Sequence, residues 1–405
     1  MRSTTFVSAC AALAIAAPRP QDIQFDLVDS ASDPEIVTPP TDIVVDIVAD
    51  LPAAFAVQVA NATVTDVAQA KPKVRRRLQQ RDGDCSPEPA GTGTHVLSPD
   101  DSPESFLAHQ PFKDDAVNAA TEANVPQGYS LAFSNLEASS QTVSYLGLRT
   151  QDKYDPIACA SYCDQHLGCF AFNLYYERDP SVSPNAANCP NPTSLTNIKC
   201  VRWGVQVTEV TATNDEQRRN DFHVVISGSN GYNKNAPPAS QPGFNGPVKL
   251  GGAISAPSDP ITNMNTYMGY KFFSFDQVQS FPNGVAACTA ACTAQTAYNS
   301  RHPPKAPAKP SVCNQAVVYV LSQNNRPQGI YCSMYSEEWA PNYATNYGQY
   351  RGSDYWSVSS AYAYTNSTYA TSYGPICAIG GCPSESFQGG NCGGYGAGTC
   401  QSIQP

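Results

Sequence analysis

The feature that most constrains the fold of this chain is an internal repeat built around cysteines. Each copy has a Tyr-x-Gly turn, then a Cys-x-x-x-Cys pair, then a cysteine that leads an alternating apolar stretch and another in a second such stretch. The turns begin at Tyr145 and Tyr267, and each copy closes on arginine, aspartate and an aromatic residue (Arg219, Asp221 and Phe222; Arg351, Asp354 and Tyr355). Because the elements follow the same order twice, we predict two copies of one module.

The residue spacing inside each copy predicts its architecture. Cys159 and Cys163, like Cys288 and Cys292, are four residues apart, which places both sulfur atoms on one face of a helix. Asp155, followed by proline, is expected to begin the first helix. The stretches FAFNLYYE and AVVYVL are rich in aromatic and β-branched residues, as half-buried strands are. We therefore predict an α+β fold in which each copy is a small antiparallel sheet with one helix stapled across it.

The N-terminal residues predict a secreted protein. Residues 1–17 combine a basic start, an uncharged apolar run and small residues before a proline, which is the pattern of a signal peptide. One of the fifteen cysteines, Cys10, lies in this segment, and an even number remains, as a disulfide framework requires. Metal-finger spacing is absent and the five histidines are scattered, so we expect neither a metal nor a cofactor.

Charge and hydropathy exclude other partners. The charged fraction is 14% and the net charge is −10, whereas nucleic-acid binding requires clustered lysine and arginine. The most apolar later stretch, residues 43–64, is interrupted by aspartate and proline, so we expect no membrane span. The sequence leaves the oligomeric state open.

Composition divides the precursor further. Residues 18–81 contain no cysteine and many prolines and acids, so we predict a disordered pro-segment. It ends in a basic cluster, with Arg77 and Arg81, that looks like a kexin or furin processing site; the alternative is a solvated linker that is never cut. The remaining units are expected to be a first module with an N-terminal extension, a linker, a second module and a Cys/Gly-rich tail (82–232, 233–247, 248–365 and 366–405).

The helix with two cysteines beside aromatic strands resembles the PAN/apple modules, specifically the tandem copies in secreted fungal proteins, over about residues 130–365. The resemblance implies four disulfides: Cys163–Cys169, Cys159–Cys200, Cys292–Cys313 and Cys288–Cys332. Cys85 and Cys189 have no counterparts in the second copy and are left to pair with each other. The tail cysteines suggest a small two-disulfide unit (Cys377, Cys382, Cys392 and Cys400).

Catalytic motifs are missing. The chain has no Gly-x-Ser-x-Gly elbow, no His-Glu-x-x-His and no phosphate-binding loop. Four acids could supply the two carboxylates of a glycosidase (Glu177, Asp179, Asp221 and Asp354), but Glu177-Arg178-Asp179 fits a self-neutralised turn better. The Arg/Asp pairs that close the copies could contact a ligand, although a structural role, with the arginine over an aromatic ring, is favoured.

Aromatic residues are the stronger functional indication. They concentrate after Tyr331, and five are candidates for ligand binding: Trp339, Tyr343, Tyr347, Tyr350 and Trp356. Aromatic faces stack on sugar rings, although core packing is the commoner use of such residues. The spacing of three or four residues fits a helix stripe or an ordered loop. Asn366 begins a glycosylation sequon, which would mark an exposed loop.

These features predict a secreted, non-catalytic protein that recognises polysaccharide or glycoprotein, since the modules it resembles bind proteins and carbohydrates. Two alternatives stay open. One is a carbohydrate-active enzyme directed at the cell wall, and the other is a structural wall or matrix protein without a discrete ligand.

Overall fold

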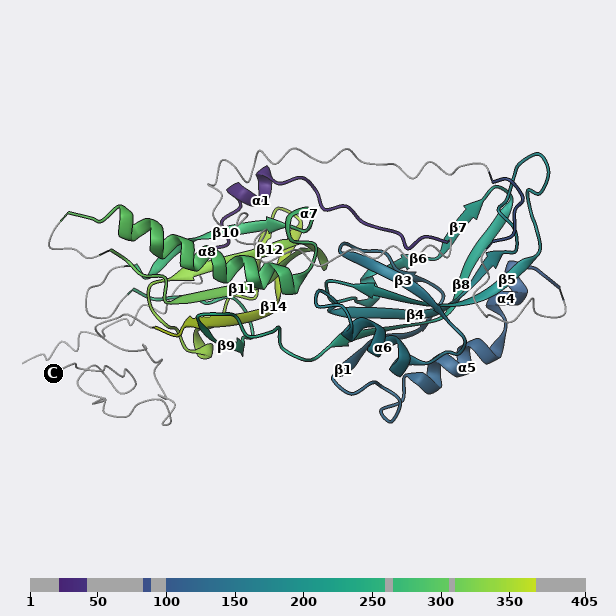
Figure 1. Cartoon of the computed structure of the whole chain (residues 1–405), viewed down its shortest axis with the longest axis horizontal. Helices are drawn as coiled ribbons and strands as arrows, with labels where there is room; N and C mark the ends of the chain where they lie inside the picture. Colours follow the sequence, from purple (N-terminus) through teal and green to yellow (C-terminus); the bar gives the residue numbers. More distant parts are fainter. Residues whose placement is uncertain (1–21, 42–82, 89–99, 259–264, 306–309, 369–405) are drawn as a thin grey trace, which may run out of the picture.

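The computed structural model describes residues 22–41, 83–88, 100–258, 265–305 and 310–368. Within these ranges the chain forms two α+β modules that lie end to end, each built on an antiparallel sheet (Figure 1). The predicted α+β class with two antiparallel sheets is confirmed. No helix of this part of the chain is long and apolar enough to cross a membrane.

Within the described residues, the first module carries its three α-helices on one face of its sheet. Phe106 and Phe112, from two of these helices, pack with Phe172 and Leu174 of the central strand, while the opposite face carries a second apolar cluster around Trp203. The helical elements are α4 (Pro103–Leu107), α5 (Gln110–Ala119), α6 (Pro156–Asp164) and η1 (Glu209–Thr211). The strands are β1 (Tyr129–Leu136), β2 (Ser139–Ser140), β3 (Tyr145–Gln151), β4 (Ala171–Pro180), β5 (Ser194–Trp203), β6 (Ala212–Asn214), β7 (Glu216–Arg219) and β8 (Phe222–Lys234).

The second module repeats this plan with one long helix. Helix α8 (Phe281–Arg301) buries Val285, Cys288 and Cys292 against the sheet. The other helical elements are α7 (Phe275–Val278) and η2 (Pro341–Tyr343), and the strands are β9 (Phe244–Lys249), β10 (Tyr267–Ser274), β11 (Gln315–Gln323), β12 (Arg326–Tyr335), β13 (Gly348–Arg351) and β14 (Asp354–Asn366).

The two sheets share one topology. The first runs β3-β5-β4-β8, with β1 and β7 both paired to β8; the second runs β10-β12-β11-β14, with β9 and β13 both paired to β14. Strands β5 and β12 carry Cys200 and Cys332, and each lies next to the central strand of its sheet. The repeat predicted from the sequence is therefore a repeat of the whole sheet.

The five disulfides join the pairs that the sequence and the resemblance indicated. Each helix is tied once to a strand beside the central one and once to the segment before the central strand (Cys159–Cys200 and Cys163–Cys169; Cys288–Cys332 and Cys292–Cys313). Cys85–Cys189 holds residues 83–88 on the loop between β4 and β5. Asp155 caps α6 as predicted, accepting hydrogen bonds from the backbone N–H groups of Ile157 and Ala158.

Three local predictions need correction. The Tyr-x-Gly elements begin β3 and β10, where Gly147 and Gly269 adopt φ of 105° and 118° at register irregularities, so they form bulges rather than turns. The hairpins that close the two copies, β7–β8 and β13–β14, both have two-residue loops. Phe222, not Asp221, therefore takes the position in the first hairpin that Asp354 takes in the second. Finally, β9 begins at Phe244, inside the predicted 233–247 linker, because an edge strand tolerates its glycine and proline.

The modules share a continuous core at their junction. Phe281, the first residue of α8, donates its backbone N–H to the carbonyl oxygen of Gly204 (2.8 Å), and its ring lies 5.1 Å from that of Phe170. Val143 and Val205 of the first module belong to the same apolar cluster as the α8 residues. The two sheets are therefore fixed by packed apolar surface, not only by the chain that connects them.

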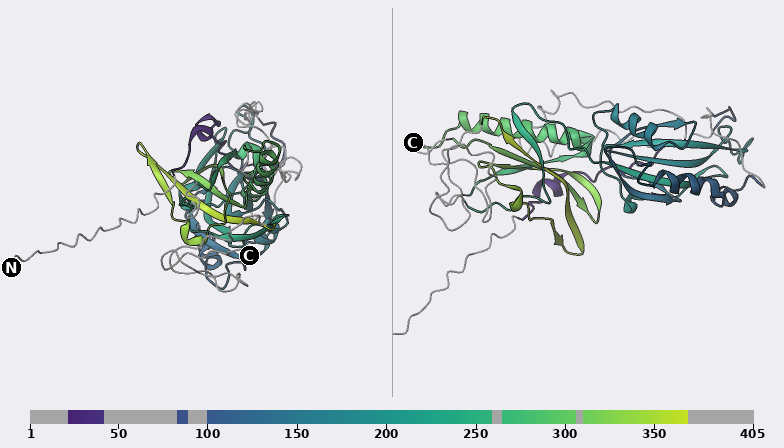
Figure 2. Two further views of the ribbon diagram at one scale, coloured as in Figure 1. Left: turned by 90° about the vertical axis from the view of Figure 1, so that its left-hand side faces the viewer. Right: turned by 90° about the horizontal axis from the view of Figure 1, so that it is seen from below.

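The prediction of a disordered pro-segment is wrong for residues 22–41. These residues, hereafter the strap, form helix α1 (Asp26–Ser30) against the second module and then run in an extended path to the first (Figures 1 and 2). Ile23 and Leu27 are buried in the core of the second module. Composition alone predicted disorder here because the segment is polar on average. A few apolar side chains that fit the core of the second module are enough to order it.

Candidate binding surface

The five predicted aromatic residues separate into buried and exposed groups. Trp339 is a core residue, 1% exposed, and its indole N–H donates to the Thr266 hydroxyl (3.1 Å). Tyr343 packs edge-on against Trp339, with ring centroids 4.8 Å apart. Trp356 is also buried, beneath the edge of Phe25 from the strap (4.9 Å). Trp339 and Trp356 are therefore not available to an external ligand, and Tyr343 is half-buried against the core.

Tyr347 and Tyr350 lie at the surface, with 59% and 73% of their area exposed. Tyr350 lies on β13 opposite Tyr355 of β14, and their rings are 4.9 Å apart. The Tyr355 hydroxyl reaches the carbonyl oxygen of Tyr347 (3.4 Å). These three residues, hereafter the tyrosine hairpin, therefore lie on one ordered loop and hairpin rather than on a helix stripe, with Tyr347 and Tyr350 exposed and Tyr355 half-buried.

Hydrogen bonds at its base hold the tyrosine hairpin. The carboxylate of Asp354 accepts from the side-chain amides of Gln323 (2.6 Å) and Asn324 (2.9 Å), and the Asn324 side-chain oxygen accepts from the backbone N–H of Tyr355 (3.0 Å). The hydrogen bond from Asn324 and, to a smaller extent, that from Gln323 lower the pKa of Asp354 below its usual value. The aspartate is thus a structural acceptor that fixes β14 to the β11–β12 turn.

The arginines that close the two copies also have structural partners. Arg351 forms a bidentate ion pair with Asp29 (2.7 and 3.0 Å) and lies over the ring of Phe25 (4.1 Å). Arg219 pairs with Glu88. In both copies, the hairpin arginine therefore holds an acid from the segments that precede the repeat.

The predicted self-neutralised turn at Glu177-Arg178-Asp179 is wrong, because these residues lie within β4 and alternate between its faces. Glu177 and Asp179 point away from the helices and share the ammonium group of Lys199 from β5. Arg178 points to the other face, over the ring of Phe222 (4.3 Å). The alternation of strand residues separates charges that are adjacent in sequence.

Burial governs the titration of this charged cluster. Glu177 and Lys199 are both 0% exposed. Burial, and then the neighbouring Asp179, raise the pKa of Glu177 well above its usual value. Burial alone would lower the pKa of Lys199. The two neighbouring carboxyl groups have the larger combined effect, so the pKa of Lys199 is raised. This carboxylate pair is not open to a substrate, because Lys199 and the strap cover it.

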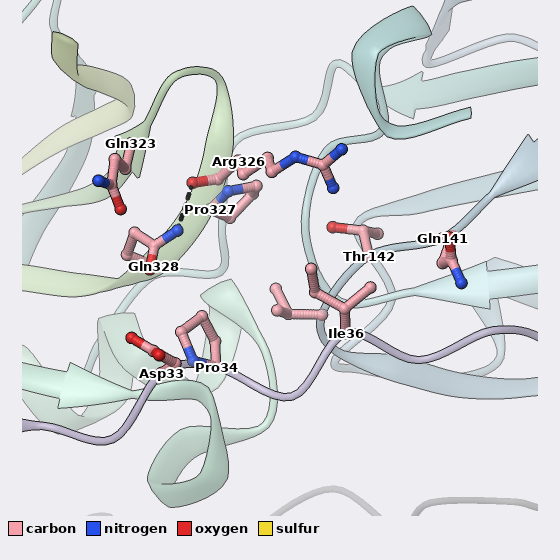
Figure 3. A pocket seen from close by; sticks show the side chains of 10 residues that line it. Asp33, Pro34, Ile36, Gln141, Thr142, Gln323, Arg326, Pro327 and Gln328 are labelled. Atoms are coloured by element: carbon pink, nitrogen blue, oxygen red, sulfur yellow. Dashed lines mark hydrogen bonds between the residues drawn. The ribbon is translucent and has the colours of Figure 1, made fainter. Parts of the chain in front are cut away.

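A cavity of about 290 Å³ lies where both modules meet the strap (Figure 3). Asp33 and Ile36 of the strap line it, with Gln141 and Thr142 of the first module. Arg326 extends into this space from the β11–β12 hairpin of the second module (Figure 3). No local sequence pattern indicates this cavity, because its three walls are far apart along the chain.

The remaining candidates divide by position. Asn366 ends β14 and is half-buried, while the other two sequon residues, Ser367 and Thr368, are exposed. The signal peptide, the basic cluster with Arg77 and Arg81, and the tail cysteines Cys377, Cys382, Cys392 and Cys400 lie outside the described residues. Among the residues whose positions are described, no three of His, Cys, Asp or Glu gather as a metal site.

Comparisons with models of protein families, with curated proteins and with solved structures found no match to this chain.

Proposed function

We propose that this is a secreted, non-catalytic binding protein with two PAN/apple-like modules, which recognises extracellular carbohydrate, free or on a glycoprotein, through the tyrosine hairpin. Exposure of Tyr347 and Tyr350, at 59% and 73%, is the observation that carries the proposal. Large exposed rings add nothing to the core of the fold, but they offer flat apolar faces on which sugar rings stack.

Rigidity supports the same function. The tyrosines stand on a hairpin fixed by Asp354 and Asn324, so little side-chain and loop freedom is lost when a ligand binds. Five disulfides are consistent with an extracellular setting. The helix stapled by two disulfides in each copy supports the PAN/apple-like assignment.

The test is retention of the secreted protein on insoluble chitin, cellulose, β-glucan and mannan, with cell-wall glycoproteins in parallel. We expect retention on at least one of these, and loss of retention in Tyr347→Ala and Tyr350→Ala. Tyr298→Ala is the matched control, because Tyr298 is 52% exposed on α8, outside the hairpin.

Each outcome is informative because the hairpin variants should fold normally. Retention that survives both hairpin substitutions would refute the assignment to these tyrosines. Equal loss in the Tyr298→Ala control would show that general aromatic exposure, not the hairpin, is responsible. No retention on any polysaccharide or glycoprotein would refute the function itself.

A further inference from the structure

The strap contacts both modules on the same kind of surface, the sheet face opposite the stapled helices. Residues 42–82, outside the described part of the chain, connect it to the remainder. In Figure 1 the strap, drawn in purple, runs from α1 over the second module to the edge of the first. The strap thus lies across the two modules as a separate peptide would lie across two domains.

On the second module the strap inserts apolar anchors into a tyrosine-rich face. Ile23 and Leu27 are 5% and 6% exposed and belong to the same apolar cluster as Tyr331 and Trp356. Polar contacts fix its register: the backbone N–H of Ile23 donates to the Gln349 side chain (2.8 Å), and that of Gln24 donates to the Tyr331 hydroxyl (3.2 Å). Apolar anchors with directional backbone contacts are typical of a recognised peptide.

On the first module the strap supplies main-chain acceptors to a buried charge. The Lys199 ammonium group donates to the carbonyl oxygens of Thr41 (3.0 Å) and Pro40 (3.3 Å) in addition to its carboxylates. The backbone N–H of Val37 donates to the carbonyl oxygen of Thr142 (2.9 Å). Departure of the strap would remove two main-chain acceptors from the Lys199 ammonium group, which disfavours that departure.

The two contact sites are equivalent positions of the repeat. Lys199 directly precedes Cys200 on β5, and Tyr331 directly precedes Cys332 on β12, in strands with the same place in each sheet. Each module therefore uses the residue before its strand cysteine to hold the strap by a hydrogen bond. The recurrence indicates that this face of the module is an acceptor surface for polypeptide.

We propose that the strap binds this acceptor surface as a ligand does, and that it stays bound when the chain is cut between residues 41 and 83. Residues 18–81 contain no cysteine, so no disulfide can retain them. A protein processed at the predicted basic cluster would then be two chains, a short N-terminal peptide and the two-module body, held together by non-covalent contacts. The acceptor surface would remain occupied, and the exposed tyrosine hairpin would remain open to other ligands.

The test replaces residues 77–81 of the full secreted chain by the recognition sequence of a site-specific protease. After complete cleavage, native size-exclusion chromatography at micromolar concentration is expected to elute peptide and body together. Denaturing electrophoresis without reductant should separate them. Elution of the peptide away from the body, whether the body stays monomeric or aggregates, would overturn the proposal.

Matched variants of the cleavable chain separate specific docking from general adhesion. Leu27→Asp places a charge in the apolar site, and Asp29→Ala removes the partner of Arg351; both are expected to shift the peptide toward the unbound fraction. Glu35→Ala is the control, since Glu35 is an exposed strap acid, and it should leave co-elution unchanged. Equal retention of the Leu27→Asp and wild-type peptides would contradict docking in the acceptor surface.

Discussion

Replacement of Lys199 by methionine is expected to lower the free energy of unfolding by about 3–5 kcal/mol, the range for removing one partner of a buried ion pair. The Lys199 ammonium group is fully buried and lies within hydrogen-bond reach of Glu177, of Asp179 (3.2 Å) and of the Thr41 carbonyl oxygen (3.0 Å). Methionine keeps much of the volume of the lysine side chain. The loss is therefore electrostatic and does not come from a cavity.

The assay is denaturant unfolding with the disulfides intact, followed by tryptophan fluorescence, because Trp203 is fully buried in the same sheet. The loss of unfolding free energy in this variant depends on pH in a definite direction. Burial and Asp179 raise the folded-state pKa of Glu177, so this group stabilises the fold at low pH and loses that contribution as pH rises; Lys199 opposes the shift. Without Lys199, the deficit in the free energy of unfolding should be greatest near neutral pH and should shrink as Glu177 becomes protonated.

Two results would refute this reasoning. One is a deficit below about 1 kcal/mol at neutral pH, the size of an ordinary hydrogen bond. The other is a deficit that does not shrink on acidification below the usual carboxyl pKa of 4.5. The control adds Glu177→Gln and Asp179→Asn to Lys199→Met, which removes the unpaired charges and should recover part of the lost stability.

Three further predictions concern stability and use the same unfolding assay. Gly204→Ala should cost about 1–3 kcal/mol, because a β-carbon there would lie 2.6 Å from that of Ser280 at the module junction; an unchanged midpoint would contradict the packed junction. Asp155→Ala removes the cap of α6 and should cost about 1 kcal/mol, whereas Asp155→Asn should retain most of the stability. Replacing Cys288 and Cys332 together by serine should cost about 2–4 kcal/mol; no loss would show that the staple is dispensable.

Sequence patterns could predict the elements whose determinants are local. The four-residue spacing of Cys159 and Cys163 placed both sulfur atoms on one helix face, and Asp155 marked the start of that helix. The alternating stretch after Cys169 became the fully buried strand β4. Periodicity and capping act within a few residues, so they can be recognised without knowledge of the tertiary fold.

Features that depend on distant segments could not be predicted in the same way. Nothing in the local sequence distinguishes Trp356, covered by Phe25, from the exposed Tyr350. The partner of Glu177 is Lys199 on the next strand, whereas its sequence neighbour Arg178 faces away. A signal was present, since acids at positions 177 and 179 share one face of a strand, and burial of that face requires a cation beside them.

Comparison of the two copies shows different residues at the same position of the closing hairpins. Tyr350 and Tyr355 face each other across β13 and β14, and the corresponding pair across β7 and β8 is Arg218 and His223. The two hairpins have the same strand pairing, but the pair is arginine and histidine in one and two tyrosines in the other. Arg218 pairs with Glu216 of its own strand, whereas the Tyr350 ring is 73% exposed. Exposed aromatic area gives the folded state no benefit, and the proposed binding function rests on this difference between the two hairpins.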